Sequence, residues 1–418
     1  MQESKQFKKN FIWNTLGTGL NAFNSLFFMI IATRVNGVDK AGIFTLAFTT
    51  ACILYAIGVY AGRIYQVTEL NKKITDIDFI ISKTTTSIAM IIFLLLFCVF
   101  KKYDIEKTMV FLALTIYKAL DAFCDVIYGV LQKNERLDIV GKSLTMKSII
   151  SVIAFLVVDL ITKNMLLAIG SIIFIYVLIS IIYDFNKAKK YIEFNIKAKF
   201  RNIVDIFKKG FFIFIISFLN IYVINVPKYS IDNYLGNDIQ TIFGILIMPA
   251  TIISLVAQFL IYPYLNKIVD LYKERDIKGF KKVLSKIIFV VILFGILATI
   301  LGYLLGTQVL GIVYGLDLSI YKMNLAIIII AATLYAIGTI YSSVLTTFRE
   351  TFSQFIIYMS VSIFAWIVSN IFTNKFGING AVWAYFCIMI IFSSMYIIYT
   401  SLKLKNIFSR ENENEGEK

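Results

Sequence analysis

The chain has 418 residues, of which 59% are hydrophobic and 16% are charged, and this composition excludes an ordinary soluble domain. It has a net charge of +15 and no histidine, which excludes HExxH zinc sites and imidazole proton relays. The four cysteines lie in apolar segments without paired spacing and are interpreted as packing residues. We expect no cofactor, no metal and no catalytic residues.

Long apolar segments dominate the chain. A helix needs about 20 mostly apolar residues to cross the hydrocarbon core of a bilayer. Twelve segments meet this requirement and predict an all-α, polytopic membrane protein with about twelve transmembrane helices. In chain order the predicted spans are 11–33, 42–65, 82–100, 108–131, 143–161, 164–183, 210–235, 239–264, 285–305, 323–347, 353–373 and 379–402.

The positive charges are unevenly placed between these spans. With the N-terminus in the cytoplasm, most of the 41 Lys and Arg fall in cytoplasmic loops, tails and flanks, where residues near a span end count as flanks, and Lys118 and Lys228 are the two assigned to span interiors. This distribution is the positive-inside rule, and it predicts a multi-pass protein of the cell membrane with both termini cytoplasmic. The basic loops are expected to touch membrane lipids. Nucleic-acid binding is not expected.

The spans divide six and six around a basic connector. The sequence FKKNF at 7–11 recurs as FKKGF at 207–211, each at the start of the first span of a half. The halves are predicted to be two pseudo-symmetric six-helix lobes, 1–190 and 191–405, with a disordered cytoplasmic tail at 406–418. The alternative is that two stretches merely share a composition.

The first span carries a polar stripe of Asn14, Thr18, Asn21 and Ser25, whose spacing places them on one helical face. Unsatisfied polar groups are costly in lipid, so this face must point to protein or water. It either lines a cavity or packs against another helix.

The cytoplasmic end of the second span contains Arg63 and Gln66. The guanidinium either reaches the lipid headgroups or binds a phosphate with two parallel hydrogen bonds. Arg34, at the outer end of the first span, presents the same two alternatives.

The fourth span carries Lys118, Asp121 and Asp125. Their spacing points them in similar directions, and a charge near the centre of a membrane costs about 2.5–3.5 kcal/mol on insertion scales. A Lys118–Asp121 pair would reduce this cost. The cluster is either a structural ion pair that locks two helices or part of a hydrophilic cavity. In a cavity, Lys118 would meet an anionic group, and Asp121 or Asp125 would accept a sugar hydroxyl or a coupling proton or sodium ion.

All three prolines, Pro227, Pro249 and Pro263, fall in the seventh and eighth spans. Each removes a backbone donor and favours a kink, so these positions are the predicted hinges, against the alternative of static kinks. Lys228 follows Pro227 and precedes Asp232 by four residues, so these two side chains are predicted to share a face.

Several local patterns resemble Wzx-type polysaccharide flippases of the multidrug/oligosaccharidyl-lipid/polysaccharide exporter superfamily. They are GVDKAGIF at 37–44, RIYQVTE at 63–69, VPKYSIDNYLG at 226–236, FGILIMPA at 243–250, LGIVYGLDLSIYK at 310–322 and FGINGA at 376–381. The resemblance implies two lobes that form a V around a central cavity. It also implies that a lipid-linked oligosaccharide, a repeat unit on undecaprenyl pyrophosphate, is flipped by alternating access. The chain departs from the lipid II flippase branch, which typically has fourteen spans.

The resemblance suggests ligands for the candidate residues. Arg63, Lys118 and Lys228 would suit the pyrophosphate, and Asn14, Asn21 and Gln66 would suit sugars. A polysaccharide polymerase and glycosyltransferases are the partners that such a flippase implies.

Three other functions stay open. A multidrug or cation antiporter shares the architecture but would favour an acidic cavity. A polysaccharide polymerase would need a larger external segment than these short outer loops, and a non-transporting scaffold would not need buried charges.

Overall fold

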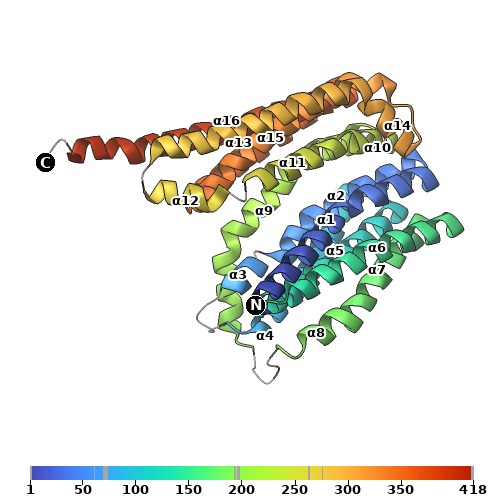
Figure 1. Ribbon diagram of the computed structural model, residues 1–418. Helices are drawn as coiled ribbons and strands as arrows, with labels where there is room; N and C mark the ends of the chain where they lie inside the picture. Colours follow the sequence, from blue (N-terminus) through green and yellow to red (C-terminus); the bar gives the residue numbers. More distant parts are fainter. Residues whose placement is uncertain are drawn as a thin grey trace. The chain divides into compact units, whose positions relative to one another are not determined.

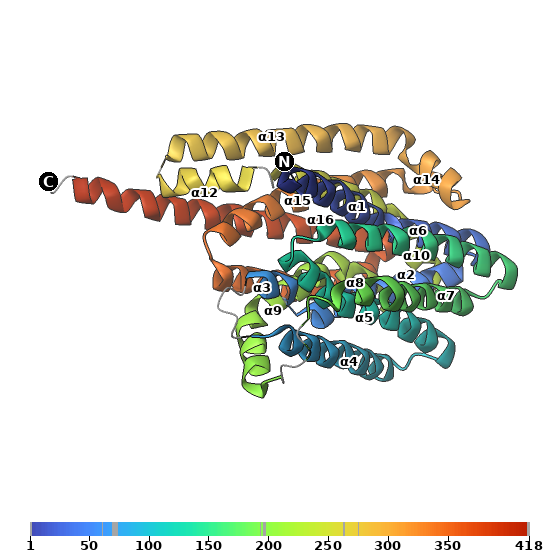
Figure 2. The same cartoon turned by 60° about the horizontal axis from the view of Figure 1, so that its bottom comes forward.

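The structure is a computed structural model that describes residues 2–60, 62–68, 74–192, 194, 198–261, 264–274 and 276–415. Every regular element within these residues is helical, which confirms the all-α prediction. The chain divides into two compact units, Met1–Ile221 and Tyr222–Lys418, here called the N-lobe and the C-lobe. Figures 1 and 2 trace the helices along the chain.

The N-lobe is built from helices that follow the first six predicted spans. They are α1 (Gln2–Asn36), α2 (Val38–Val59), α3 (Gly62–Thr68), α4 (Asp76–Lys101), α5 (Ile105–Lys133), α6 (Leu137–Thr162), α7 (Met165–Ile179), the π-helical η1 (Ser180–Phe185) and α8 (Asn186–Ala188). Helix α1 packs on α6, and α5 packs on α2, α4 and α7. Helix α5 is thus the central helix of this lobe.

Helix α9 (Phe200–Tyr234) runs from the N-lobe into the C-lobe. The C-lobe continues with α10 (Asn237–Leu246), α11 (Met248–Ile261), α12 (Leu265–Lys273), α13 (Ile277–Leu301), the π-helical η3 (Gly302–Gly306), α14 (Thr307–Tyr314), the 3₁₀ turn η4 (Ser319–Tyr321), α15 (Lys322–Thr347) and α16 (Thr351–Glu415). Helix α15 is buried along much of its length and packs on α11, α13 and α16.

Polar side chains at the predicted turns set the helix starts. Thr75 and Asp78 form a reciprocal capping box at the start of α4, and Asp104 accepts a hydrogen bond from the Lys107 amide at the start of α5. Asn164 caps α7 in the same way. These caps satisfy amides that lack a partner within their helix.

Large apolar side chains cover the outside of the helices. On α13, Phe289, Leu293 and Ile300 are each more than half exposed, and Ile161 at the end of α6 is 78% exposed. Apolar surface of this extent is unfavourable in water and suits contact with lipid chains. The exposed apolar faces therefore support membrane insertion.

Ten helical segments in the described residues are long and apolar enough to cross a membrane, compared with twelve predicted spans. One of them, Thr351–Leu404, covers the last two predicted spans, which meet at a break where Gly377 takes a left-handed φ of 59°. The predicted fourth span, which forms α5, is not among the ten because Lys118, Asp121 and Asp125 give it more charged residues than such an apolar segment contains. Both differences concern spans that the structure contains as helices.

The two compact units divide the chain at a different residue from the predicted lobes. The division between the lobes lies inside α9, after Ile221, rather than after residue 190, because the start of α9 packs with the N-lobe: Tyr60 stacks on Phe214 and donates to the Phe207 carbonyl. The backbone is helical to Glu415, and disorder of the tail from 406 stays a prediction.

Candidate functional site

The cluster predicted from the fourth span lies in the middle of α5. The Lys118 Nζ lies 3.1 Å from the Asp121 Oδ2, so the predicted pair forms within one helix and does not itself lock two helices. The same ammonium lies over the rings of Phe48 and Tyr55 from α2, at 5.6 and 5.4 Å from their centroids. Aromatic faces attract a cation, so α2 and α5 together hold Lys118 in an aromatic box.

Asp125, one turn further along α5, is paired with two cations. Its Oδ1 lies 4.0 Å from the Arg63 Nη1, and its Oδ2 lies 3.5 Å from the Lys83 Nζ. The Arg63 Nε also donates to the Gln132 side chain at 2.7 Å. In this conformation Arg63 is therefore turned into the lobe, against α5.

Lys83 was missed by sequence reasoning, which placed it in a cytoplasmic flank. Its side chain is only 3% exposed, because α4 packs on α2 and α5 at this level. The available signal was its position one residue inside the predicted third span, where a lysine requires a partner.

A second buried ion pair, Lys147 with Asp184, was also missed. The Lys147 Nζ lies 2.7 Å from the Asp184 Oδ2, and neither side chain is exposed. The ammonium also donates to the Tyr128 hydroxyl at 2.9 Å. This pair joins α6 to the π-helical turn η1. Sequence reasoning counted Lys147 among the residues of the cytoplasmic flanks and did not single out Asp184.

The polar stripe of α1 is partly used for helix packing. The Tyr176 hydroxyl of α7 donates to the Asn21 Oδ1 at 3.4 Å and lies 3.3 Å from the Tyr117 hydroxyl of α5. Asn14 is half-buried and Thr18 is exposed. Asn21 thus contacts a neighbouring helix, while the stripe is not fully covered by the N-lobe.

Gln66 is fully buried between α3 and α5. Its Nε2 donates to the Val126 carbonyl at 3.2 Å, and a Cβ atom at Gly129 would overlap its amide. In this conformation Gln66 holds α3 against α5, and contact with a sugar would require α3 to move.

The remaining candidates lie in the C-lobe. Lys228 is 8% exposed in α9, where Pro227 is accommodated inside a continuous helix. Pro249 lies in the first turn of α11, directly after the break that ends α10 at Leu246. Pro263 lies outside the described residues.

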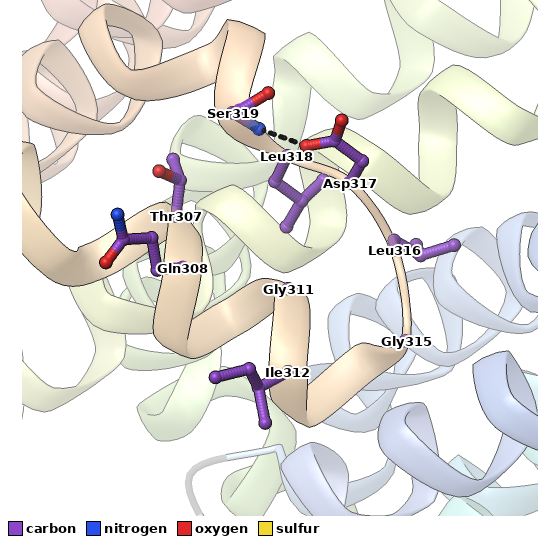
Figure 3. Close-up of a pocket in the computed structure, with 9 residues that line it drawn as sticks. All are labelled: Thr307, Gln308, Gly311, Ile312, Gly315, Leu316, Asp317, Leu318 and Ser319. Carbon is purple, nitrogen blue, oxygen red and sulfur yellow. Dashed lines mark hydrogen bonds between the residues drawn. The ribbon is translucent and has the colours of Figure 1, made fainter.

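A separate hollow of about 580 Å³ lies in the C-lobe around the end of α14, as Figure 3 shows. The Asp317 Oδ1 accepts a hydrogen bond of 2.9 Å from the Ser319 amide, drawn as a dashed line in Figure 3. This bond and one from the Ser319 hydroxyl hold the pKa of Asp317 below its usual value. The carboxylate is satisfied by its own loop, and the hollow contains none of the predicted site residues.

Comparisons with known proteins support the resemblance drawn from the sequence. No model of a known protein family matches the chain. The capsular polysaccharide biosynthesis protein CapF of Staphylococcus aureus is 25% identical over 331 residues, which cover 77% of this chain and 80% of CapF.

Two solved structures show the fold. An inward-facing multidrug resistance MATE family transporter of the MOP superfamily matches with a TM-score of 0.69 and 11% identity, over 95% of this chain and 98% of its own. The lipid II flippase MurJ in an inward closed conformation matches with a TM-score of 0.66 and 16% identity, over 94% of this chain and 90% of its own. The chain therefore has the two-lobed fold of MOP-superfamily transporters, as the sequence resemblance implied.

Proposed function

We propose that this protein is a flippase that moves a lipid-linked oligosaccharide across the cytoplasmic membrane for surface polysaccharide biosynthesis. The similarity to CapF, which extends over most of both chains, is the observation that carries the proposal. The fold shared with a lipid II flippase supports it. A transporter fold favours this role over a polymerase or a scaffold.

The proposed cargo is a repeat unit on undecaprenyl pyrophosphate, with its lipid tail in the bilayer and its polar part in a hydrophilic cavity of the protein. Arg63, Lys118 and Lys228 are the proposed pyrophosphate contacts, and Asn14, Asn21 and Gln66 the proposed sugar contacts. The N-lobe geometry supports the first assignment, because cations outnumber carboxylates where Arg63 and Lys83 both face Asp125. The polymerase and the glycosyltransferases that make and use the repeat unit are the proposed partners.

Removal of the Lys118 ammonium tests this function. Lys118→Ala is expected to lower surface polysaccharide at least 10-fold and to leave lipid-linked oligosaccharide in the inner leaflet. The reason is that the pyrophosphate of the cargo loses its cationic partner. The protein should still accumulate in the membrane. The readouts are capsule immunostaining and extraction of lipid-linked sugars.

Lys9→Ala, at an exposed lysine of α1, is the control and should export normally. Normal export by both Lys118→Ala and Arg63→Ala would remove the two cations from the site. Normal capsule in a strain that lacks the whole protein would refute the function itself.

Asp121 and Asp125 remain the proposed ion-coupling residues, and each is paired with a lysine in this conformation. Asp121→Asn and Asp125→Asn are expected to weaken the dependence of transport on a proton or sodium gradient. Transport in vesicles with each gradient collapsed in turn measures this. Wild-type transport that is indifferent to both gradients would exclude a coupling role.

A multidrug or cation antiporter is the alternative, since the same fold occurs in MATE transporters. The paired charges of α5 disfavour it, because Lys118 and Lys83 offset the carboxylates that a cationic drug would need. Drug resistance conferred by expression, with capsule unaffected by deletion, would favour the antiporter.

A further inference from the structure

The second predicted span is interrupted at its cytoplasmic end. Helix α2 ends at Val59, Tyr60 is left-handed (φ 38°, ψ 58°), and α3 begins at Gly62. The last carbonyls of a helix lack partners within the helix and carry about half a negative charge together. The interruption therefore places a negative helix end inside the N-lobe.

Two side chains of α4 satisfy this helix end. The Thr86 hydroxyl donates to the Gly58 carbonyl at 2.8 Å, and the Lys83 ammonium donates to the Val59 carbonyl. A Cβ atom at Gly62 would overlap the Lys83 Nζ and Cε, so the glycine provides the space that the ammonium fills. Lys83 is thus fitted to the end of α2.

The same ammonium faces a carboxylate on its other side. The Asp125 Oδ2 lies 3.5 Å from the Lys83 Nζ, and it accepts no hydrogen bond from the described residues. A backbone carbonyl at a helix end and a buried carboxylate therefore meet at one point. In transporters, the C-terminal ends of interrupted helices and unwound carbonyls are ligands for sodium.

We propose that the Lys83 ammonium is a tethered cation that fills a monovalent-cation site made by the Val59 carbonyl and the Asp125 carboxylate. The native protein needs no sodium or potassium ion at this point, and shortening Lys83 converts the point into a sodium site completed by water. This inference concerns an ion site and holds whatever cargo the protein carries.

When Lys83 is shortened, the charges around the site favour a dissolved cation in the place of its ammonium over an empty space. Asp125 and the end of α2 bring about one and a half negative charges, and Lys83 and Arg63 bring two positive ones. Without Lys83, the Arg63 Nη1 remains 4.0 Å from the Asp125 Oδ1, and the guanidinium is held by its hydrogen bond to Gln132. The Val59 carbonyl and the Asp125 Oδ2 would then both lack a cation.

The position of Lys83 affects ion coupling through Asp125. A sodium ion that acts through Asp125 must first displace Lys83, whereas the pair of Lys118 and Asp121 does not involve this helix end.

Thermal unfolding of the purified full-length protein tests the proposal. The comparison is made in an Asp121→Asn background, which removes any sodium response that comes from Asp121. At constant ionic strength, replacing choline by sodium should leave the midpoint unchanged while Lys83 is intact. Lys83→Ala should be destabilised in choline and regain on the order of 5 °C as sodium saturates the new site. Binding of ²²Na⁺, present with Lys83→Ala and absent with an intact Lys83, should accompany the shift.

Three control variants separate a cation site from a lost ion pair. Lys83→Met removes the charge but fills the space, so sodium should not raise the unfolding midpoint of this variant. Lys83→Ala combined with Asp125→Asn should lose the sodium response. Lys147→Ala breaks another buried pair of the N-lobe, where the ammonium contacts Asp184 and the Tyr128 hydroxyl, and should be destabilised equally in both salts.

If Lys83→Ala does not accumulate, Lys83→Asn serves instead, since it leaves most of the space and adds an oxygen ligand. The proposal is overturned if neither variant binds ²²Na⁺, if Lys83→Ala and Lys83→Met respond alike to every salt, or if the Asp121→Asn protein with an intact Lys83 is stabilised by sodium.

Discussion

Lys147 and Asp184 form the most deeply buried ion pair found in the described part of the N-lobe. Both side chains have no exposure, and the Tyr128 hydroxyl lies 3.1 Å from the Ser143 hydroxyl while it accepts from Lys147. Removing one member of such a pair strands a buried charge and costs about 3–5 kcal/mol, whereas replacing both can be nearly neutral. The pair therefore links α6 to η1, and each charge depends on the other.

Lys147→Met is expected to destabilise the protein by about 3–5 kcal/mol, because Asp184 is left buried without a cation. The double variant Lys147→Met with Asp184→Leu should regain most of this loss. Denaturant unfolding of the detergent-solubilised protein measures both. Equal stability of Lys147→Met and the wild type would mean that Asp184 is neutral or solvated.

At the scale of the helix, glycine decides how closely α1 and α6 approach. A Cβ atom at Gly17 would overlap the Gly141 carbonyl, and a Cβ atom at Gly141 would overlap the backbone of Trp13. Small residues allow such close helix crossings in membranes. The polar stripe of α1 starts at this crossing, so the fit of the glycines also sets where Asn14 lies.

Gly141→Leu is expected to separate α1 from α6 and to cost about 1–3 kcal/mol or more, since an overpacked contact forces backbone shifts. Gly170→Leu is the matched control, because a Cβ atom at Gly170 in α7 would meet nothing within 4 Å. Thermal stability of the two purified variants provides the comparison. A Gly141→Leu protein as stable as Gly170→Leu would show that the crossing tolerates a side chain.

At the scale of the whole molecule, each lobe has its own charged or polar interior. The N-lobe holds buried ion pairs on α4, α5, α6 and η1, while the C-lobe buries Lys228 and is joined by polar contacts such as the 2.7 Å hydrogen bond from Asn324 to Asn379. The ion pairs of the N-lobe include Asp121 and Asp125, the residues proposed for ion coupling. The proposed tethered cation, Lys83, lies in the same lobe as Arg63.

The orientation in the membrane remains a prediction from the positive-inside rule. A green fluorescent protein fused after Lys418 should fluoresce, and alkaline phosphatase at the same place should be inactive, because both report a cytoplasmic C-terminus. A phosphatase fusion near Lys163, at the predicted outer end of α6, should be active. The reverse pattern would invert the assignment of cytoplasmic and outer residues.

The sequence by itself determined the class of the protein and much of its organisation. The length of an apolar segment needed to cross a bilayer is a local property, so the twelve spans appear as helices, with the last two joined at Gly377. The spacing of Lys118 and Asp121 is also local, because residues three apart share a helical face, and their pair forms as predicted.

Only the tertiary structure decided the partners of Asp125 and the burial of Lys83 and Lys147. These depend on which helices pack together, since α4 brings Lys83 to the end of α2 and η1 brings Asp184 to α6. No spacing along one helix encodes such a meeting. A lysine near a span end is solvated or buried according to its neighbouring helix, and that neighbour is set by packing between segments far apart in the chain.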